Sequence, residues 1–224
     1  MDKPRRILGI DPGINGACAL YCPDEIVPTP SGGLFDIPTV GESKQREIDY
    51  AELRNLIYAL QPTVAVIEIV NAFMPARGQG MQATDDEGEK VAWGNTSLFR
   101  FGGSYYAIHA VVACLDIPRH RVTSPAWKGH FGLRGKKKSG GIDDSARQIV
   151  LQRWPAVHPF LKRKGDQHRA EAFLMAAWYA QTADQPKRKS PSKQARTERR
   201  AARFAKLEQQ QGLGFEDDGL DIPE

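Results

Sequence analysis

The segment Val64–Val70, which reads VAVIEIV, constrains the fold more than any other part of the chain. A continuous β-branched and apolar run of this length is typical of a strand that is buried on both faces of a sheet. One charge, Glu68, lies within the run, and a buried carboxylate is costly unless it is paired or bound to a metal. The run therefore predicts an interior strand and a cation close to Glu68.

Apolar spacing predicts further elements on both sides of this strand. Residues 6–20 fit two strands or one bent strand with Asp11 at the bend, and short strands are predicted over 34–37 and 121–123. Helices are predicted over 49–60, 96–115, 142–154 and 166–182. In the second of these helices Thr96 would be the N-cap, and Gly102 and Gly103 would permit close packing. This order predicts an α/β domain with a mixed sheet.

Two segments lack such periodicity. Residues 71–95 are polar and glycine-containing, which predicts a long exposed loop. Residues 124–141, SPAWKGHFGLRGKKKSGG, are basic and rich in glycine, and they separate the last short strand from the next helix.

The length of 224 residues suits one domain with an appendage. We predict a folded domain over residues 1–183 and a charged, flexible tail over 184–224, because the tail has too few large apolar residues to pack. Nine Lys and Arg residues lie between Lys187 and Lys206, and acidic residues follow them. Such a tail is suited to bind nucleic acid or another protein.

Composition also bears on the compartment. Although 41% of the residues are hydrophobic, no apolar stretch is long enough to span a bilayer, so no membrane association is expected. The first residues lack the apolar core of a secretory signal, and the three cysteines lack zinc-type spacing. We therefore expect a cytoplasmic protein.

Four side chains are candidate metal ligands. Asp11 ends the first strand, Glu68 ends the central one, and His168 and Glu171 are three apart on one face of the last helix. Such a set can hold two divalent ions for phosphodiester hydrolysis, with Mg²⁺ preferred by oxygen ligands and Mn²⁺ admitted by the histidine. Each residue alone also has an ordinary interpretation, since Asp before Pro-Gly commonly forms turns and an exposed helical Glu is commonly only solvated.

Several segments together resemble a known family. They are ILGIDPGINGACAL, AVIEIV, SLFRFGGSYYAIHAVV, VTSPAWKGHFG and DQHRAEAFLMAAW. Their order and spacing, over roughly residues 6–181, are similar to the RuvC-like Holliday-junction resolvases of the ribonuclease H-like superfamily. The resemblance implies a mixed five-stranded sheet flanked by helices and a crossover junction endodeoxyribonuclease that acts on branched DNA as a homodimer. It also implies that Asp11, Glu68, His168 and Glu171 are the metal-binding catalytic residues, with Asp166 as a possible substitute for His168 and with the 96–115 helix as the dimer interface.

Basic residues supply candidate DNA contacts. Lys128, Arg134, Lys136, Lys137 and Lys138 gather five positive charges in eleven residues, and the family has DNA-contacting lysines in the same interval. Lys162, Arg163, Lys164 and Arg169 extend this basic rim. Phe73 and Arg77 are candidate base contacts, and residues 81–93 look like an insertion relative to the family.

Two other functions fit parts of the sequence. One is a DNA-binding relative without catalysis, which would not need all four ligand positions to be occupied. The other is a nucleotide-binding ATPase of the actin, chaperone and sugar-kinase superfamily, whose first phosphate loop is similar. That superfamily has a second glycine-rich phosphate loop and a longer chain, and neither is found here.

Overall fold

The computed structural model describes residues 4–25, 29–42, 46–70, 82–84, 90–92, 95–133, 144–183 and 202, without the side chains of 82–84, 90–92 and 95–98. The chain divides into two units, Met1–Asp184 and Gln185–Glu224. All described residues except residue 202 lie in the first unit. The properties predicted for the tail therefore stay predictions.

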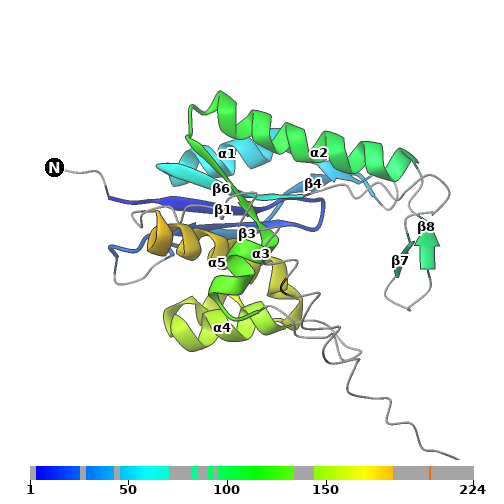
Figure 1. Cartoon of the computed structure of the whole chain (residues 1–224). Helices are drawn as coiled ribbons and strands as arrows, with labels where there is room; N and C mark the ends of the chain where they lie inside the picture. Colours follow the sequence, from blue (N-terminus) through cyan, green and yellow to red (C-terminus); the bar gives the residue numbers. More distant parts are fainter. Residues whose placement is uncertain are drawn as a thin grey trace, which may run out of the picture. The chain divides into compact units, whose positions relative to one another are not determined.

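A mixed sheet lies at the centre of the first unit (Figure 1). It has five strands in the order β3-β2-β1-β6-β9. The strands are Ile7–Asp11 (β1), Ala17–Tyr21 (β2), Leu34–Asp36 (β3), Val64–Ile69 (β6) and Arg119–Thr123 (β9). β1–β2 and β2–β3 are antiparallel pairs, whereas β1–β6 and β6–β9 are parallel. The predicted mixed five-stranded α/β sheet flanked by helices is confirmed, and residues 6–20 form two strands.

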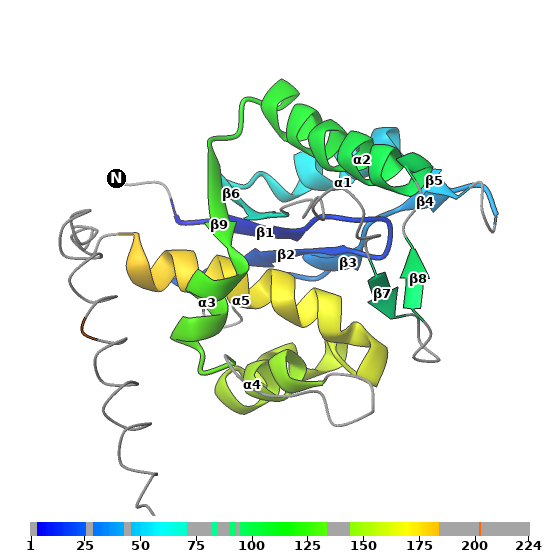
Figure 2. The same ribbon diagram turned by 45° about the vertical axis from the view of Figure 1, so that its right-hand side comes forward.

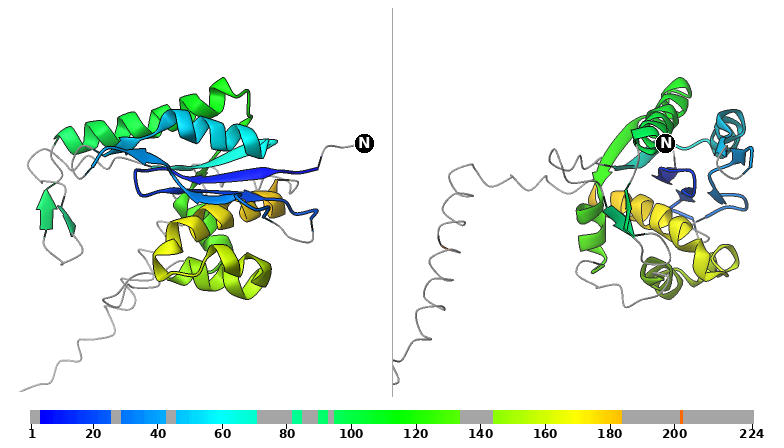
Figure 3. Two further views of the ribbon diagram at one scale, coloured as in Figure 1. Left: turned by 180° about the vertical axis from the view of Figure 1, so that it is seen from behind. Right: turned by 90° about the vertical axis from the view of Figure 1, so that its right-hand side faces the viewer.

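Helices cover both faces of this sheet (Figure 2). One face packs against Tyr50–Leu60 (α1) and Asn95–Cys114 (α2), and the other packs against Ser124–His130 (α3), Ser145–Arg153 (α4) and Gln167–Thr182 (α5). The two layers are also visible from behind and from the side (Figure 3). Two short 3₁₀ helices, Pro155–Phe160 (η2) and Lys164–Asp166 (η3), connect α4 to α5.

The alternation of side chains along the strands explains the two cores. In β1, Leu8 and Ile10 belong to the buried cluster shared with α1 and α2, whereas Ile7 belongs to the cluster shared with α5. In β6, Val66 faces α5, while Ala65 and Ile67 face the other layer. Since successive side chains of a strand point to opposite faces, the odd-numbered residues of β1 and the even-numbered residues of β6 share the α5 face.

A helix and a small hairpin lie after β3. α1 begins as predicted, because the Asp49 side chain accepts a hydrogen bond of 2.9 Å from the backbone N–H of Glu52, and Gln61 ends the helix with a φ of 45°. Before it, Thr39–Val40 (β4) pairs antiparallel with Glu47–Ile48 (β5). This hairpin was not predicted.

Three local predictions were wrong. Within the predicted loop over 71–95, Gln82–Thr84 (β7) and Lys90–Ala92 (β8) pair as a hairpin. Thr96 lies inside α2, which already includes Asn95. A Cβ placed on Gly102 or Gly103 would have no described atom of another element within 4 Å. These glycines therefore do not mediate close packing within the described residues.

The segment SPAWKGH, predicted as part of a basic glycine-rich stretch, forms α3. Pro125 lies in its first turn, where proline suits a helix, and the fully buried Trp127 anchors it to the core. Among the described residues, no helix has the length and apolarity needed to cross a membrane.

Candidate active site

Asp11 and Glu68 lie side by side at the carboxyl ends of β1 and β6. These strands pair in parallel with Ile10 opposite Ile67, so the next residue of each strand is one of the two acids. Both acids lie on the α5 face, by the alternation described above. The strand pairing alone thus brings together two carboxylates that are 57 residues apart in the sequence.

Gly9 allows α5 to approach this end of the sheet. A Cβ at Gly9 would lie 1.9 Å from the carbonyl oxygen of Ala172, so only glycine leaves room for the helix backbone at this position. The first turns of α5 carry His168 and Glu171. Nδ1 of His168 lies 2.7 Å from Oδ2 of Asp11, which joins the helix to β1 by a direct polar contact.

Glu68 is half-buried and accepts a hydrogen bond of 3.3 Å from Nε1 of Trp127. Burial raises the pKa of Glu68, and the negative charge of Asp11 adds to this, while hydrogen bonds from Ser124 and Trp127 and the charge of Lys128 partly oppose it. Ser124 and Trp127 both belong to α3. The helix that the sequence did not reveal thus forms one wall of the site.

Glu171 has two partners. Nζ of Lys128 lies 3.3 Å from its Oε1, and Nε2 of Gln167 donates to the same oxygen at 3.2 Å. Burial raises the pKa of Glu171, the charge of Asp11 adds to the rise, and Lys128 and Gln167 oppose it. The side chain of Glu171 is 14% exposed and that of Lys128 is 33% exposed. Lys128, predicted to contact DNA, therefore lies at the candidate site itself.

The four predicted ligands form one electrostatic group. Asp11 raises the pKa of both glutamates, and the hydrogen bond to Asp11, followed by the charges of Asp11 and Glu171, raises the pKa of His168 against the opposing effect of burial. No group of three or more His, Cys, Asp or Glu side chains in the described part of the chain has the arrangement of a metal site. The oxygen and imidazole donors of these residues nevertheless suit Mg²⁺ or Mn²⁺. A divalent cation would offset the free-energy cost of burying the two ionised glutamates.

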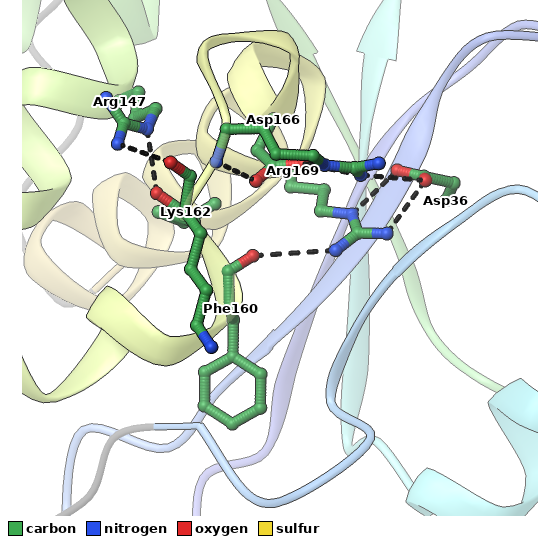
Figure 4. Close-up of polar contacts among 8 residues, drawn as sticks. Asp36, Arg147, Phe160, Lys162, Asp166 and Arg169 are labelled. Atoms are coloured by element: carbon green, nitrogen blue, oxygen red, sulfur yellow. Dashed lines mark hydrogen bonds and ion pairs between the residues drawn. The ribbon is translucent and has the colours of Figure 1, made fainter.

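A network of ion pairs holds the start of α5 against β3 (Figure 4). Arg169 donates to both carboxylate oxygens of Asp36 at 2.7 Å, and Arg163 lies 3.9 Å from the same carboxylate. Asp166 accepts hydrogen bonds from the backbone and the guanidinium of Arg163 at 2.7–3.0 Å. The Asp166 carboxylate is thus engaged by Arg163 in the capping box of η3 and, within the described residues, makes no side-chain hydrogen bond to the start of α5. Arg169 of the predicted basic rim is paired with an acid.

A second arginine fixes the segment before α5. Arg147 donates to the carbonyl oxygens of Leu161 and Lys162 at 2.7 and 3.2 Å (Figure 4). It also pairs with Asp144 at 3.1 Å. The other predicted DNA contacts, namely Arg134, Lys136, Lys137, Lys138, Phe73 and Arg77, lie outside the described residues, as does most of the apparent insertion over 81–93.

Replacing Asp166 by asparagine should destabilise the domain in a pH-dependent way. Burial alone would raise the pKa of Asp166, but the hydrogen bonds and charge of Arg163 and the charge of Arg169 lower it overall. An acid whose pKa is lowered by folding stabilises the protein at pH values above its unfolded pKa of about 3.9. This contribution to stability is lost as the pH falls through the folded pKa. Urea unfolding at pH 7 should show that the free energy of unfolding of Asp166→Asn is about 2 kcal/mol below that of wild type. The difference between the two proteins should become smaller below about pH 4.

Asp24→Asn is the matched control, because Asp24 pairs with Arg5 at the surface, where both side chains are 48% exposed. It should change the unfolding free energy little at any pH. Equal losses in the two variants, or a loss in Asp166→Asn that is independent of pH, would contradict this role of Asp166.

Comparisons with known proteins gave matches among solved structures only. No protein-family model and no curated protein sequence matches the chain. A structure of Thermus thermophilus RuvC in complex with a Holliday junction substrate is similar with a TM-score of 0.45 and 15% identity, over 79% of this chain and 95% of that chain. Another structure of Thermus thermophilus RuvC is similar with a TM-score of 0.42 and 15% identity, over 80% and 96%.

Proposed function

We propose that this protein is a metal-dependent DNA endonuclease that cleaves four-way junctions or related branched DNA by phosphodiester hydrolysis. The observation that carries the proposal is the meeting of Asp11, Glu68, His168 and Glu171, from two strands and a helix, at one end of the sheet. The sequence resemblance to the RuvC-like resolvases supports the same four residues and the same chemistry.

Asp11, Glu68, His168 and Glu171 would hold two Mg²⁺ ions, with Mn²⁺ as the alternative. Bound there, the metal ions would activate the attacking water and neutralise charge on the leaving oxygen. The protein's own residues prepare the site. His168 and Asp11 fix one another, and Trp127 orients the Glu68 carboxylate. The Nζ atom of Lys128 lies 3.3 Å from Oε1 of Glu171. Lys128 would therefore also place a positive charge next to a DNA phosphate that enters the site.

Cleavage of a synthetic four-way junction, compared with a replication fork, a flap and a linear duplex of the same sequence, tests the substrate class. We expect Mg²⁺-dependent cleavage of the junction at a rate above that of the linear duplex. Equal cleavage rates on all four substrates would contradict the proposed preference for branched DNA and would indicate a nuclease that cuts any duplex.

Neutralising Lys136, Lys137 and Lys138 together to glutamine should weaken binding to every DNA substrate. Each lost phosphate contact lowers the slope of log affinity against log salt by about 0.9 for duplex DNA. Fluorescence anisotropy between 50 and 200 mM salt, about the range over which such contacts are screened, measures this slope. An unchanged slope would mean that these lysines form a solvated loop that does not contact phosphate.

We also propose that the protein acts as a homodimer through α2. Phe99 and Tyr106 are 82% and 69% exposed on this helix, and a Cβ on Gly102 or Gly103 would meet no described atom of another element within 4 Å. These residues follow one another at spacings of three and four, so they form one apolar stripe. Two copies of the active site would suit the paired incisions that resolve a four-way junction.

Removing residues 184–224 should leave a folded protein that still cuts DNA. The tail is predicted to add affinity or partners through its basic run and to take no part in the catalytic fold. Binding should weaken at physiological salt, where charges are screened over about 8 Å. A truncated protein that is insoluble, or that melts many degrees below the full chain, would show that the tail packs on the domain.

A further inference from the structure

A polar pocket of about 360 Å³ opens beside His168. Its walls come from the β1–β2 turn, the end of β3, Thr39 of β4, Arg46 and the start of α5. A volume of this size is within the range of sites that hold a small ligand. The pocket shares His168 with the candidate active site, so a group bound in the pocket would lie next to the reacting centre.

Arg46 is held in this pocket by the β1–β2 turn. Its Nη2 donates to the backbone oxygen of Ile14 at 3.2 Å and to the side-chain oxygen of Asn15. Both hydrogen bonds come from the same nitrogen, and toward the described residues Nε and Nη1 make no others. The guanidinium is thus fixed in place while most of its donors stay available for an anion.

The acid in the pocket wall is already neutralised. Asp36 accepts two hydrogen bonds of 2.7 Å from Arg169 and lies 3.9 Å from Arg163. An anion that enters the pocket would therefore meet Arg46 and a carboxylate whose charge is already neutralised. This charge arrangement favours a phosphate group over a cation.

We propose that this pocket binds one nucleotide of the cleaved DNA strand, next to the scissile phosphate, with Arg46 donating to the phosphate of that nucleotide. The proposal rests on the proposed function and deepens it, because it names a binding subsite away from the lysine-rich loop. Arg46 would be a positioning residue that sets which phosphodiester reaches Asp11 and Glu68.

Thr39→Glu tests the pocket without disturbing the hydrogen bonds of Arg46. Thr39 is exposed and lines the pocket, whereas its neighbour Val40, which is 50% exposed, does not. Neighbouring residues of a strand point to opposite faces, so Val40→Glu adds the same charge one residue away from the pocket. Val40 pairs with Glu47 across the hairpin. Repulsion between Glu47 and the new glutamate would therefore destabilise the control variant, Val40→Glu, rather than Thr39→Glu.

The measurement is binding of a synthetic four-way junction in EDTA, so that metal-dependent cleavage does not interfere. A series of junctions carries one uncharged methylphosphonate at each successive position around the expected cleavage site. Thr39→Glu should bind the unmodified junction about tenfold more weakly than wild type, as expected for the loss of one charge-assisted contact. Val40→Glu should bind within about twofold of wild type, since surface charges contribute little.

One methylphosphonate position should weaken wild type and Val40→Glu about tenfold and leave Thr39→Glu nearly unaffected, because the two changes remove the same contact. Equal effects of Thr39→Glu and Val40→Glu, or the absence of any such position, would overturn the pocket proposal even if the protein cuts DNA. The expected pattern in a protein that cuts no DNA would support the pocket and contradict the nuclease. A protein that binds no DNA at all would overturn both proposals.

Discussion

Asp11→Asn and Glu68→Gln should each abolish cleavage of a four-way junction while leaving the affinity for the junction within a few-fold of wild type. Each change removes a negative charge from the proposed metal site and no phosphate contact. Single-turnover cleavage in Mg²⁺, together with binding in EDTA, measures the two effects separately. Near-normal cleavage by either purified variant would remove that residue from the metal site.

The stability of Glu68→Gln provides an internal control for this experiment. Burial and the charge of Asp11 raise the pKa of Glu68, so the ionised carboxylate destabilises the fold at neutral pH when no cation is bound. The neutral glutamine should therefore melt at the same temperature as wild type in EDTA, or higher. Glu47→Gln, at an exposed position of β5, is the matched control for charge and should keep full cleavage. Loss of cleavage without loss of stability is the expected signature of a catalytic acid.

Gly9→Ala should cause the largest loss of stability among single substitutions of the described glycines. The added Cβ would lie 1.9 Å from the carbonyl oxygen of Ala172 and 2.9 Å from its carbon, both of which are backbone atoms of α5. The helix has to move away from β1, at a cost of about 3 kcal/mol, the upper end of the usual overpacking range. Because α5 carries His168 and Glu171, cleavage should fall even where the protein stays folded.

Gly102→Ala is the matched control for packing within one protomer, because an added Cβ there meets no described atom of another element within 4 Å and the residue lies inside α2. Alanine is favoured over glycine inside a helix by about 0.5–1 kcal/mol, so this variant should be slightly more stable than wild type. Urea unfolding of both variants tests the pair. A Gly9→Ala protein as stable as Gly102→Ala would show that α5 does not approach β1 as closely as described.

The sequence predicted those parts of the fold whose apolar pattern is strong. The run VAVIEIV and the segment ILGID gave two strands, and their alternation is what places Glu68 and Asp11 on one face. In the same way, the spacing of apolar residues over 166–182 predicted α5 and placed His168 and Glu171 on one face of it. Such patterns report burial, and burial is what organises the sheet and its covering helix.

The polar parts of the site were not predictable in this way. Asp36 and Arg169 are 133 residues apart, and no local pattern relates an ion pair at that distance. α3 was missed because a short helix with proline and glycine has little periodicity, although the large apolar Trp127 amid basic and small residues was an available signal. Arg46 likewise has no sequence signature, since its position depends on how the β1–β2 turn meets the hairpin.

Cleavage of an end-labelled four-way junction by the purified full-length protein, in Mg²⁺ and in EDTA, tests the proposed nuclease most directly. We expect the junction to be cut at a phosphodiester in Mg²⁺, with no product in EDTA and none from Asp11→Asn in either condition. Binding to the junction without cleavage in either Mg²⁺ or Mn²⁺ would contradict the proposed nuclease and would leave a DNA-binding relative that does not catalyse hydrolysis.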